Sequence, residues 1–523
     1  MIDPLKDHLA TVQDLRHAAA VLEWDQETHM PSGGADARAH QIATLRRLAH
    51  ATFASDTTAR LLDEAEPEGE IEDALVRLTR RDLARATRLP EDSVARLAEA
   101  TSRAKTAWAQ ARVESDWSQF APHLQRILNL TVEKADLLRP QIAEERGADY
   151  APAPADARYD ALLDEYEPGA STAEIAATFA DLRAQLVPLV NEIGGRLPVD
   201  DGPLSRYVPE AVQWELGMEI AHEFGYDLER GRQDLSAHPF TTSFGADDVR
   251  ITTRIDPNFF PTALYGTLHE TGHALYEQGF SPSIARTPLA DGTSLGIHES
   301  QSRLWENQVG RSKAFWRRHF ASFQERIGSW GDLNPDAVWR AVNRVKPSLI
   351  RVEADEVTYH LHVLLRFTLE RELVAGRLDV KDVPEAWNAG MQTLLGVAPG
   401  SDKDGCLQDI HWSLGALGYF PTYTLGTLMS AQLWSAMGRA LGGSEDDPGA
   451  ALEPIVRAGE YDKILGWLRT HVHQYGRARS AAQILRDATG SDLEAGPWLA
   501  YIRAKVDDVY GAPSSGATRF FDG

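Results

Sequence analysis

Two histidines four residues apart carry the clearest chemical signal in the sequence, in the segment His269-Glu270-Thr271-Gly272-His273. On an α-helix such residues lie ~40° apart around the axis and ~6 Å apart along it, so both imidazoles can reach one metal ion. Glu270 then stands beside the ion, where its carboxylate can take a proton from water. The pattern predicts a zinc site with Glu270 as general base.

The motif alone leaves open a plainer interpretation, two surface histidines on a helix. In a chain of 523 residues with 17 His, random order would produce the pattern about 0.1 times or fewer. The surrounding sequence and the supply of a third ligand therefore decide between the two interpretations.

The third ligand distinguishes subtypes of such metal sites. A third histidine on the same segment would stand six residues beyond His273, with a glycine three residues before it, but the chain has Tyr276 and Gly279 at these two positions. The alternative is a glutamate on a following helix, and Glu299 lies 299 − 273 = 26 residues beyond His273, which leaves room for a loop and a returning helix. Two histidines and one carboxylate are the familiar hydrolytic set. Three residues compete with Glu299 as ligands: Glu277 and Glu306, which we expect to be solvated or ion-paired, and His298.

The motif needs a helix to position it, and the sequence around it supplies one. Pro261 suits the first turn, Gly279 can end the helix, and an apolar face is formed by Leu264, Leu268 and Leu275. Just upstream, residues 249–255 alternate between apolar or Thr side chains and Arg or Thr side chains, which is typical of a half-buried strand. Residues 240–245 read as the preceding strand of a hairpin.

The rest of the chain reads at helical period. The clearest helical stretches are 33–62, 73–113, 123–146, 171–194 and 209–224. The breaks at 66–70, 151–159 and 196–204 are short enough to be loops between helices. We therefore expect a mostly α fold, with one catalytic domain over 1–510, built as two helical lobes, and a flexible tail over 511–523.

Composition narrows the function classes. A formal net charge of −24 repels phosphate backbones, which argues against nucleic acid as a partner. The single cysteine, Cys406, excludes an intrachain disulfide. Asp3 and Asp7 stand where a signal peptide would carry positive charge, and no apolar run reaches the ~20 residues needed to cross a bilayer. These features favour a cytoplasmic protein without a membrane partner.

Seven further motifs follow one another along nearly the whole chain. They are Trp24-Asp25-Gln26-Glu27-Thr28, His238-Pro239-Phe240, Asp248-Val249-Arg250-Ile251-Thr252, His298-Glu299-Ser300-Gln301, Ile350-Arg351-Val352-Glu353-Ala354-Asp355, the segment from Gly405 to Trp412 and the segment from Gly418 to Tyr423. With these motifs the sequence resembles the thermostable carboxypeptidase Taq family of metallocarboxypeptidases. No chemically required position departs from the family's pattern.

The resemblance implies several properties. The fold would be mostly helical and groove-forming, similar to angiotensin-converting enzyme and neurolysin, and usually a homodimer. The activity would be removal of C-terminal residues from peptide substrates with broad specificity, typically sparing proline. The cofactor would be zinc, with cobalt as a possible replacement.

Roles for further residues follow partly from this resemblance. Peptide hydrolysis needs a group that stabilises the tetrahedral oxyanion, and by family analogy we assign it to Tyr423, with Tyr419 and His411 as rivals. For each of them a purely structural role is nearly as plausible.

A carboxypeptidase must also bind a terminal carboxylate, which favours the forked guanidinium of arginine. Arg351 fits by motif, and an ion pair with Asp355 four residues on is its structural alternative. Arg250 is a second candidate, which Asp248 explains equally well. His238 could line the groove, and the hairpin edge could pair with the substrate backbone.

Two other functions remain open from the sequence alone. A metallo-oligopeptidase would use the same chemistry and cut internally. A non-catalytic peptide-binding scaffold would have no use for Glu270, so the intact base argues against it.

Overall fold

The structure is a computed structural model that describes residues 2–328, 333–445 and 447–511. The chain forms two compact units, which are treated one at a time below. The first unit combines residues up to Thr87 with Asp200–Val342 and Gly426–Glu494. The second unit combines Arg88–Val199, Asn343–Leu425 and the described residues from Ala495 onward. Of the predicted tail, residues 512–523 lie outside the described residues.

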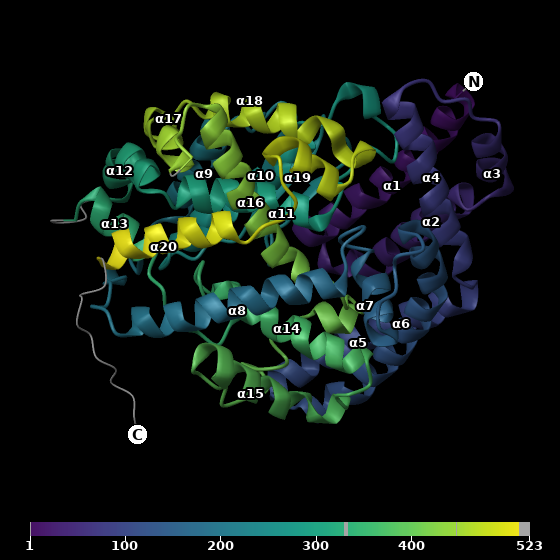
Figure 1. Cartoon of the computed structure of the whole chain (residues 1–523), viewed down its shortest axis with the longest axis horizontal. Helices are drawn as coiled ribbons and strands as arrows, with labels where there is room; N and C mark the ends of the chain where they lie inside the picture. The colour runs from purple at the N-terminus through teal and green to yellow at the C-terminus, as the bar shows by residue number, and fades with distance from the viewer. Residues whose placement is uncertain (1, 329–332, 446, 512–523) are drawn as a thin grey trace. The chain divides into compact units, whose positions relative to one another are not determined.

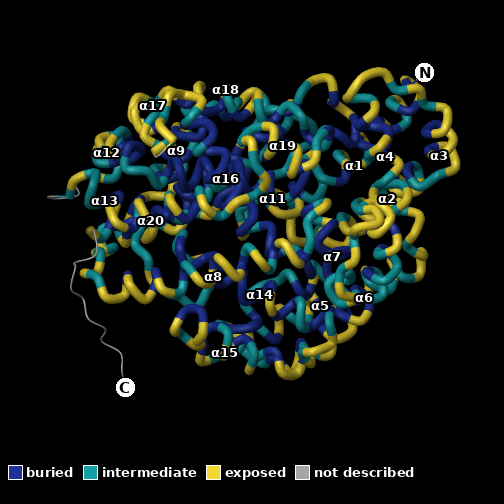
Figure 2. The backbone as a smooth tube through the Cα atoms, in the orientation of Figure 1, coloured by how far each residue is buried: buried dark blue, intermediate teal, exposed yellow. Residues whose placement is uncertain are grey.

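Helices dominate both units (Figure 1), which confirms the predicted mostly α class. The first unit contains α1 (Asp3–Thr28), α2 (Ala35–Phe53), α3 (Asp56–Asp63), nearly all of α4 (Glu70–Arg88), α9 (Glu210–Glu223), α10 (Pro261–Glu277), α11 (Leu295–Arg303), α12 (Lys313–Ile327), α13 (Pro335–Val342), α17 (Leu452–Ala458), α18 (Tyr461–His471) and α19 (Ala481–Thr489). The second unit contains α5 (Glu91–Glu114), α6 (Trp117–Arg146), α7 (Pro154–Leu163), α8 (Thr172–Gly194), α14 (Tyr359–Val374), α15 (Val383–Leu395) and α20 (Gly496–Tyr510). The chain passes between the units within α16 (Pro421–Ala440), which is buried along nearly its whole length (Figure 2).

Three of the predicted helical stretches correspond to α6, α8 and α9, and two were predicted too long. Residues 33–62 form two helices because the chain breaks at Ala54 and Ser55 then caps α3, its hydroxyl accepting from Thr58 N–H. Residues 73–113 also form two helices because Pro90 stands between them, and proline cannot continue a helix.

The predicted hairpin is present as part of a three-stranded sheet. Strand β2 (Thr241–Ser243) pairs antiparallel with β3 (Val249–Thr253). On its other side β3 pairs in parallel with β1 (Gly231–Leu235), which the sequence analysis missed. The order β1-β3-β2 leaves β2 at an edge.

Strand β3 is buried more completely than its alternating pattern predicted. Thr252, expected on the exposed face, is 0% exposed. Its hydroxyl accepts from Phe240 N–H at 2.9 Å and lies 2.7 Å from the Ser236 hydroxyl. These hydrogen bonds satisfy the polar group and make its burial possible.

Helices α10 and α11 begin where their sequences allow. Pro261 opens α10, and the three leucines of its predicted apolar face are buried. The helix ends at Glu277 with Gln278 as its cap, and Gly279 follows without a left-handed conformation, so the expected glycine cap is wrong. Ser294 caps α11 by accepting from Ile297 N–H at 3.0 Å.

None of the helices in the described ranges combines the length and the apolar composition that crossing a bilayer would require.

Candidate metal centre

The two helices of the centre approach each other unusually closely. A Cβ atom at Gly272 would lie 2.5 Å from the carbonyl oxygen of Gln301 on α11. A Cβ atom at Gly426 of α16 would lie 2.6 Å from Cβ of Glu299. Glycine at these two positions lets α11 fit between α10 and α16. The contact brings Glu299 to the face of α10 that carries the histidines.

His269, His273 and Glu299 converge on one point. One ligand atom from each lies within 4.8 Å of the others. The Nε2 atoms of His269 and His273 are each 3.5 Å from Oε2 of Glu299. Two imidazole nitrogens and a carboxylate oxygen at this spacing are a donor set that fits a divalent ion such as zinc.

In His269 and in His273 the ring nitrogen Nδ1 is hydrogen-bonded to a neighbouring side chain, which leaves Nε2 directed toward the centre. Nδ1 of His269 lies 2.9 Å from Oε2 of Glu306. Nδ1 of His273 lies 2.6 Å from Nδ1 of His298, whose Nε2 lies 2.8 Å from Oε1 of Glu277. Since carboxylates accept, we assign protons to Nδ1 of His269, Nδ1 of His273 and Nε2 of His298. Both Nε2 lone pairs are then available to a metal.

The three residues that competed with Glu299 lie around the candidate ligands. Glu306 contacts His269, His298 contacts His273, and Glu277 contacts His298. Glu277 and Glu306 are 8% exposed. Glu306 is ion-paired with Arg303 and Arg311, as expected. Glu277 is neither solvated nor ion-paired, because it accepts from a His298 ring that this proton assignment leaves neutral. Glu306 lies in a π-helical segment (Leu304–Gly310) that continues α11, and such segments are frequent at functional sites. It also accepts from Arg303 at 3.3 Å and from Arg311 at 3.2 Å.

The electrostatics suit metal binding. Burial disfavours the charged form of His273 and lowers its pKa to about 3, which keeps the ring neutral. Burial raises the pKa of Glu299, but the Arg303 guanidinium, which donates to Oε1 at 2.6 Å, and His269 outweigh burial and hold that pKa well below its ordinary value. Glu299 is thus a carboxylate whose Oε2 remains directed at the histidines.

Glu270 lies beside this set without belonging to it. The Thr241 hydroxyl of β2 donates to Oε2 of Glu270 at 2.7 Å. Burial raises the pKa of Glu270 above its ordinary value, and His269 offsets part of that rise. A carboxylate with a raised pKa is the better proton acceptor at neutral pH.

Two more of the predicted residues belong to the first unit. Arg250 makes a two-pronged ion pair with Asp248, at 2.8 Å for both bonds, and its guanidinium lies over the Trp24 ring at 4.3 Å. This pairing is the alternative that the sequence analysis gave for Arg250. His238 lies exposed in the loop between β1 and β2, where its carbonyl accepts from Ser236 at 2.7 Å.

Arg351 lies in the second unit, in a short 3₁₀ turn (Arg351–Glu353) rather than on a helix with Asp355. The predicted ion pair between Arg351 and Asp355 is therefore wrong. Nε and Nη2 of Arg351 instead donate to Oδ1 of Asp409 at 3.0 and 2.8 Å. Arg366 donates to Oδ2 of the same carboxylate at 2.7 Å. Asp355 instead accepts from backbone groups, those of Lys346, Val357 and Thr358.

The three candidate oxyanion residues gather near Arg351. His411 Nε2 lies 3.2 Å from the Tyr423 hydroxyl, and the Tyr419 and Tyr423 rings are 5.4 Å apart. The Arg351 guanidinium lies 4.9 Å from the centre of the Tyr423 ring. Burial lowers the pKa of His411 to about 4, so its ring is neutral.

A buried glutamate anchors the segment that carries these residues. Glu370 of α14 accepts from Trp412 Nε1 at 2.9 Å, from Gly418 N–H at 3.0 Å and from the Tyr159 hydroxyl at 2.7 Å. Burial nevertheless raises its pKa to about 7.

Sequence reasoning missed the roles of Thr241, Arg303, Arg366, Asp409 and Glu370. Asp409 lies within a family motif, which is a signal that could have directed attention to it. Arg303 stands four residues after Glu299 on α11, and that spacing is a local signal of an ion pair. Thr241, Arg366 and Glu370 are joined to their partners by contacts between segments distant in the sequence.

Comparisons with known proteins identify the family of the chain. The family described as carboxypeptidase Taq (M32) metallopeptidase matches residues 4–506. The chain is 42% identical to thermostable carboxypeptidase 1 of Thermus thermophilus, covering 95% of this chain and 96% of that protein. It is 35% identical to carboxypeptidase 1 of Bacillus subtilis, covering 96% and 97%.

Solved structures give the same result. An M32 carboxypeptidase from Deinococcus radiodurans superposes with a TM-score of 0.91 at 38% identity, covering 98% of this chain and 99% of that one. Metallocarboxypeptidase 1 of Trypanosoma cruzi superposes with a TM-score of 0.88 at 33% identity, covering 97% and 99%. The chain therefore belongs to the carboxypeptidase Taq (M32) family of metallopeptidases and is a metallocarboxypeptidase.

Proposed function

We propose that His269, His273 and Glu299 hold the catalytic metal and that this metal is zinc, with cobalt able to replace it. The convergence of both Nε2 atoms on Oε2 of Glu299, with both Nδ1 atoms occupied, is the observation that carries the proposal. The donor set is the one that hydrolytic zinc sites use, and cobalt accepts the same nitrogen and oxygen ligands.

A divalent ion bound there would supply Lewis-acid chemistry, polarising a carbonyl group and lowering the pKa of a water molecule. Glu270 is the proposed general base: its carboxylate takes the proton from the attacking water and delivers it to the leaving amine. Thr241 orients Glu270 through its bond to Oε2, so the proton-accepting oxygens have a fixed direction.

In the second unit, we propose that Arg351 binds the terminal carboxylate of the peptide. Arg351 and Arg366 share the single carboxylate of Asp409, so this buried cluster carries one positive charge that Asp409 does not neutralise. An entering carboxylate would neutralise that charge. Tyr423 remains the proposed oxyanion donor, with Tyr419 and His411 as alternatives.

Further properties are proposed from the family resemblance. The substrates are peptides, cut from the C-terminus with broad specificity and with proline disfavoured, and the protein is a homodimer. Its location in the cytoplasm is proposed from the sequence features described above and not from the family. Arg250 and His238 stay predicted substrate contacts. The open edge of β2 is the proposed place where the substrate backbone pairs.

Metal analysis of purified protein tests the ligand set. We expect wild-type protein and the control variant Glu325→Ala, whose exposed side chain lies on α12, to retain one zinc per chain. Glu299→Ala should lose both zinc and activity while its circular dichroism spectrum stays helical. If Glu299→Ala retains stoichiometric zinc, the third ligand is another residue.

A further inference from the structure

We propose that the cavity between the C-terminal end of α1 and strand β2 is a subsite for a positively charged side chain of the peptide substrate, on the amino side of the scissile bond. This inference rests on the proposed function and adds a specificity determinant to it. Glu27 is the residue that we assign as the determinant.

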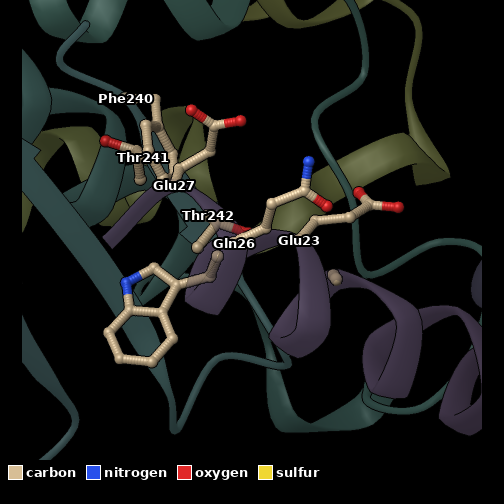
Figure 3. A pocket seen from close by; sticks show the side chains of 8 residues that line it. Glu23, Gln26, Glu27, Phe240, Thr241 and Thr242 are labelled. Carbon is tan, nitrogen blue, oxygen red and sulfur yellow. The ribbon is translucent and has the colours of Figure 1, made fainter. Parts of the chain in front are cut away.

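The cavity has the size of a side-chain subsite. Its volume is about 360 Å³, near the lower end of the ~300–1,000 Å³ range of ligand pockets. Figure 3 shows its polar lining of Glu23, Gln26 and Glu27 from α1 and its other wall of Phe240, Thr241 and Thr242. Residues 24–28 form the first family motif of the chain, for which the metal site and its reaction provide no role.

The position of β2 connects this cavity to the reaction. Phe240 and Phe244 flank β2. Thr252 N–H donates to the Phe240 carbonyl, and Phe244 N–H donates to the Asp248 carbonyl, so the backbone groups of the even-numbered residues here face β3. Antiparallel pairing alternates, so the backbone groups of Thr241 and Ser243 face the open edge. Thr241 also holds Glu270. A substrate strand on this edge therefore runs past the general base and past the cavity.

The side chains of such a strand would alternate between the two faces of the sheet. Thr241 points to the face covered by α10, where it meets Glu270. Thr242 is paired with Arg250, which stacks on Trp24 of α1. Every second substrate side chain is thus directed to the α1 side, where the cavity lies.

The charge of the cavity selects among those side chains. Glu23 is neutralised by Arg46 at 2.6 Å, and Arg250 is neutralised by Asp248. Glu27, by contrast, has no ion-pair partner among the residues that the structure describes. The cavity therefore presents one uncompensated carboxylate.

The chemistry of lysine and arginine matches this lining. Their methylene stems pack against apolar surface while the charged head remains in a polar environment. Phe240 and Trp24 provide the apolar surface, and Glu27 and Gln26 provide acceptors for the head. An acidic side chain would meet Glu27 with like charge, and a small apolar one would leave the cavity unfilled.

Matched peptides that contain arginine or its neutral isostere citrulline test the subsite. One set places the pair at each of the three positions before the scissile bond, with the same C-terminal residue throughout, and kcat/KM is measured with zinc-loaded protein from the amino acid released. For wild-type protein and for the control Glu229→Gln, whose side chain is exposed, we expect arginine to be favoured at one position by about three- to tenfold, the range of a partly exposed ion pair. Glu27→Gln should bring that ratio close to one. Glu27→Arg should favour glutamate over glutamine at the same position.

The outcomes separate this inference from the proposed function. Release of the C-terminal residue with equal efficiency from the arginine and citrulline peptides at all three positions would overturn the subsite and leave the carboxypeptidase intact. A preference that survives both Glu27 variants would also overturn it. Absence of any metal-dependent release by the wild-type protein would overturn the proposed function, and the subsite with it.

Discussion

Gly272 lies inside the motif that carries two of the proposed metal ligands, and its replacement by alanine tests how Glu299, the proposed third ligand, is positioned. A Cβ atom there would lie 2.5 Å from the Gln301 carbonyl oxygen and 2.6 Å from Cα of Ser302. Ordinary contacts begin at 3.4 Å, so α11 must move away from α10 by about 0.9 Å, the difference of the two distances. That movement carries Glu299 with it.

Two effects of opposite sign contribute to the change in unfolding free energy of Gly272→Ala. Alanine is about 1 kcal/mol better than glycine in a helix interior, whereas overpacking costs about 1–3 kcal/mol. Gly266 is a matched control on the same helix, because a Cβ atom there has its nearest neighbour at 3.6 Å. We expect Gly266→Ala to be equally or more stable than the wild-type protein. Gly272→Ala should be less stable than Gly266→Ala by about 1–3 kcal/mol, since the helix term cancels between them.

Zinc affinity should respond as well. Metal–ligand distances tolerate a deviation of about 0.2 Å, so a displaced Glu299 should weaken zinc binding by about tenfold or more. Competition with a chromophoric chelator measures the affinity, and denaturant unfolding of the metal-free proteins measures the stability. If Gly272→Ala equals Gly266→Ala in both, close contact between α10 and α11 does not position Glu299, and the reasoning is refuted.

Three further variants have defined outcomes. Glu306→Gln loses the charge that holds His269 Nδ1, so zinc affinity by chelator competition should fall by about tenfold while kcat at saturating zinc stays within a few-fold of wild type; an unchanged affinity would contradict that role. Glu270→Gln cannot accept a proton, so turnover should fall by about 10²–10⁴ or more with normal zinc content, and near-normal turnover would remove Glu270 from the base role. Burial raises the pKa of Glu370 from 4.5 to about 7, so its contribution to stability is present below pH 4.5 and is lost as the pH rises through 7, by about 3 kcal/mol. Unfolding free energies from pH 4.5 to 7 should show that loss relative to Glu370→Gln, and parallel curves would contradict it.

The sequence predicted the parts of the fold that local patterns determine. Strand β3 and the helix α10 were found because their apolar residues recur at the periods of a strand and a helix. Strand β1 was missed because it has no such pattern: Gln233 and Asp234 are buried. Gln233 accepts a hydrogen bond from Thr267 of α10, and Asp234 is hydrogen-bonded to His29, which follows α1. A polar strand buried by long-range bonds cannot be identified from its own residues.

The candidate site likewise has a part that local sequence patterns predict and a part that they do not. His269, Glu270 and His273 follow from one helical motif, and Glu299 follows from its place in a second motif. Their supporting contacts do not, because Thr241, Glu306 and the pair of His298 and Glu277 meet the site only after the helices have packed. Gly272 occupies one of the two unspecified positions of the motif, and the structure alone gives it a reason.

The pattern of cleavage tests the central claim most directly. Zinc-loaded protein is incubated with one peptide as its free acid and as its C-terminal amide, and mass spectrometry follows the products. We predict single residues released stepwise from the acid and a loss of about ten- to hundredfold in kcat/KM for the amide, which lacks a charge-assisted contact to Arg351. Arg351→Ala should impair cleavage of the acid similarly and add little on the amide. Internal fragments formed from both peptides at equal rates would contradict the account.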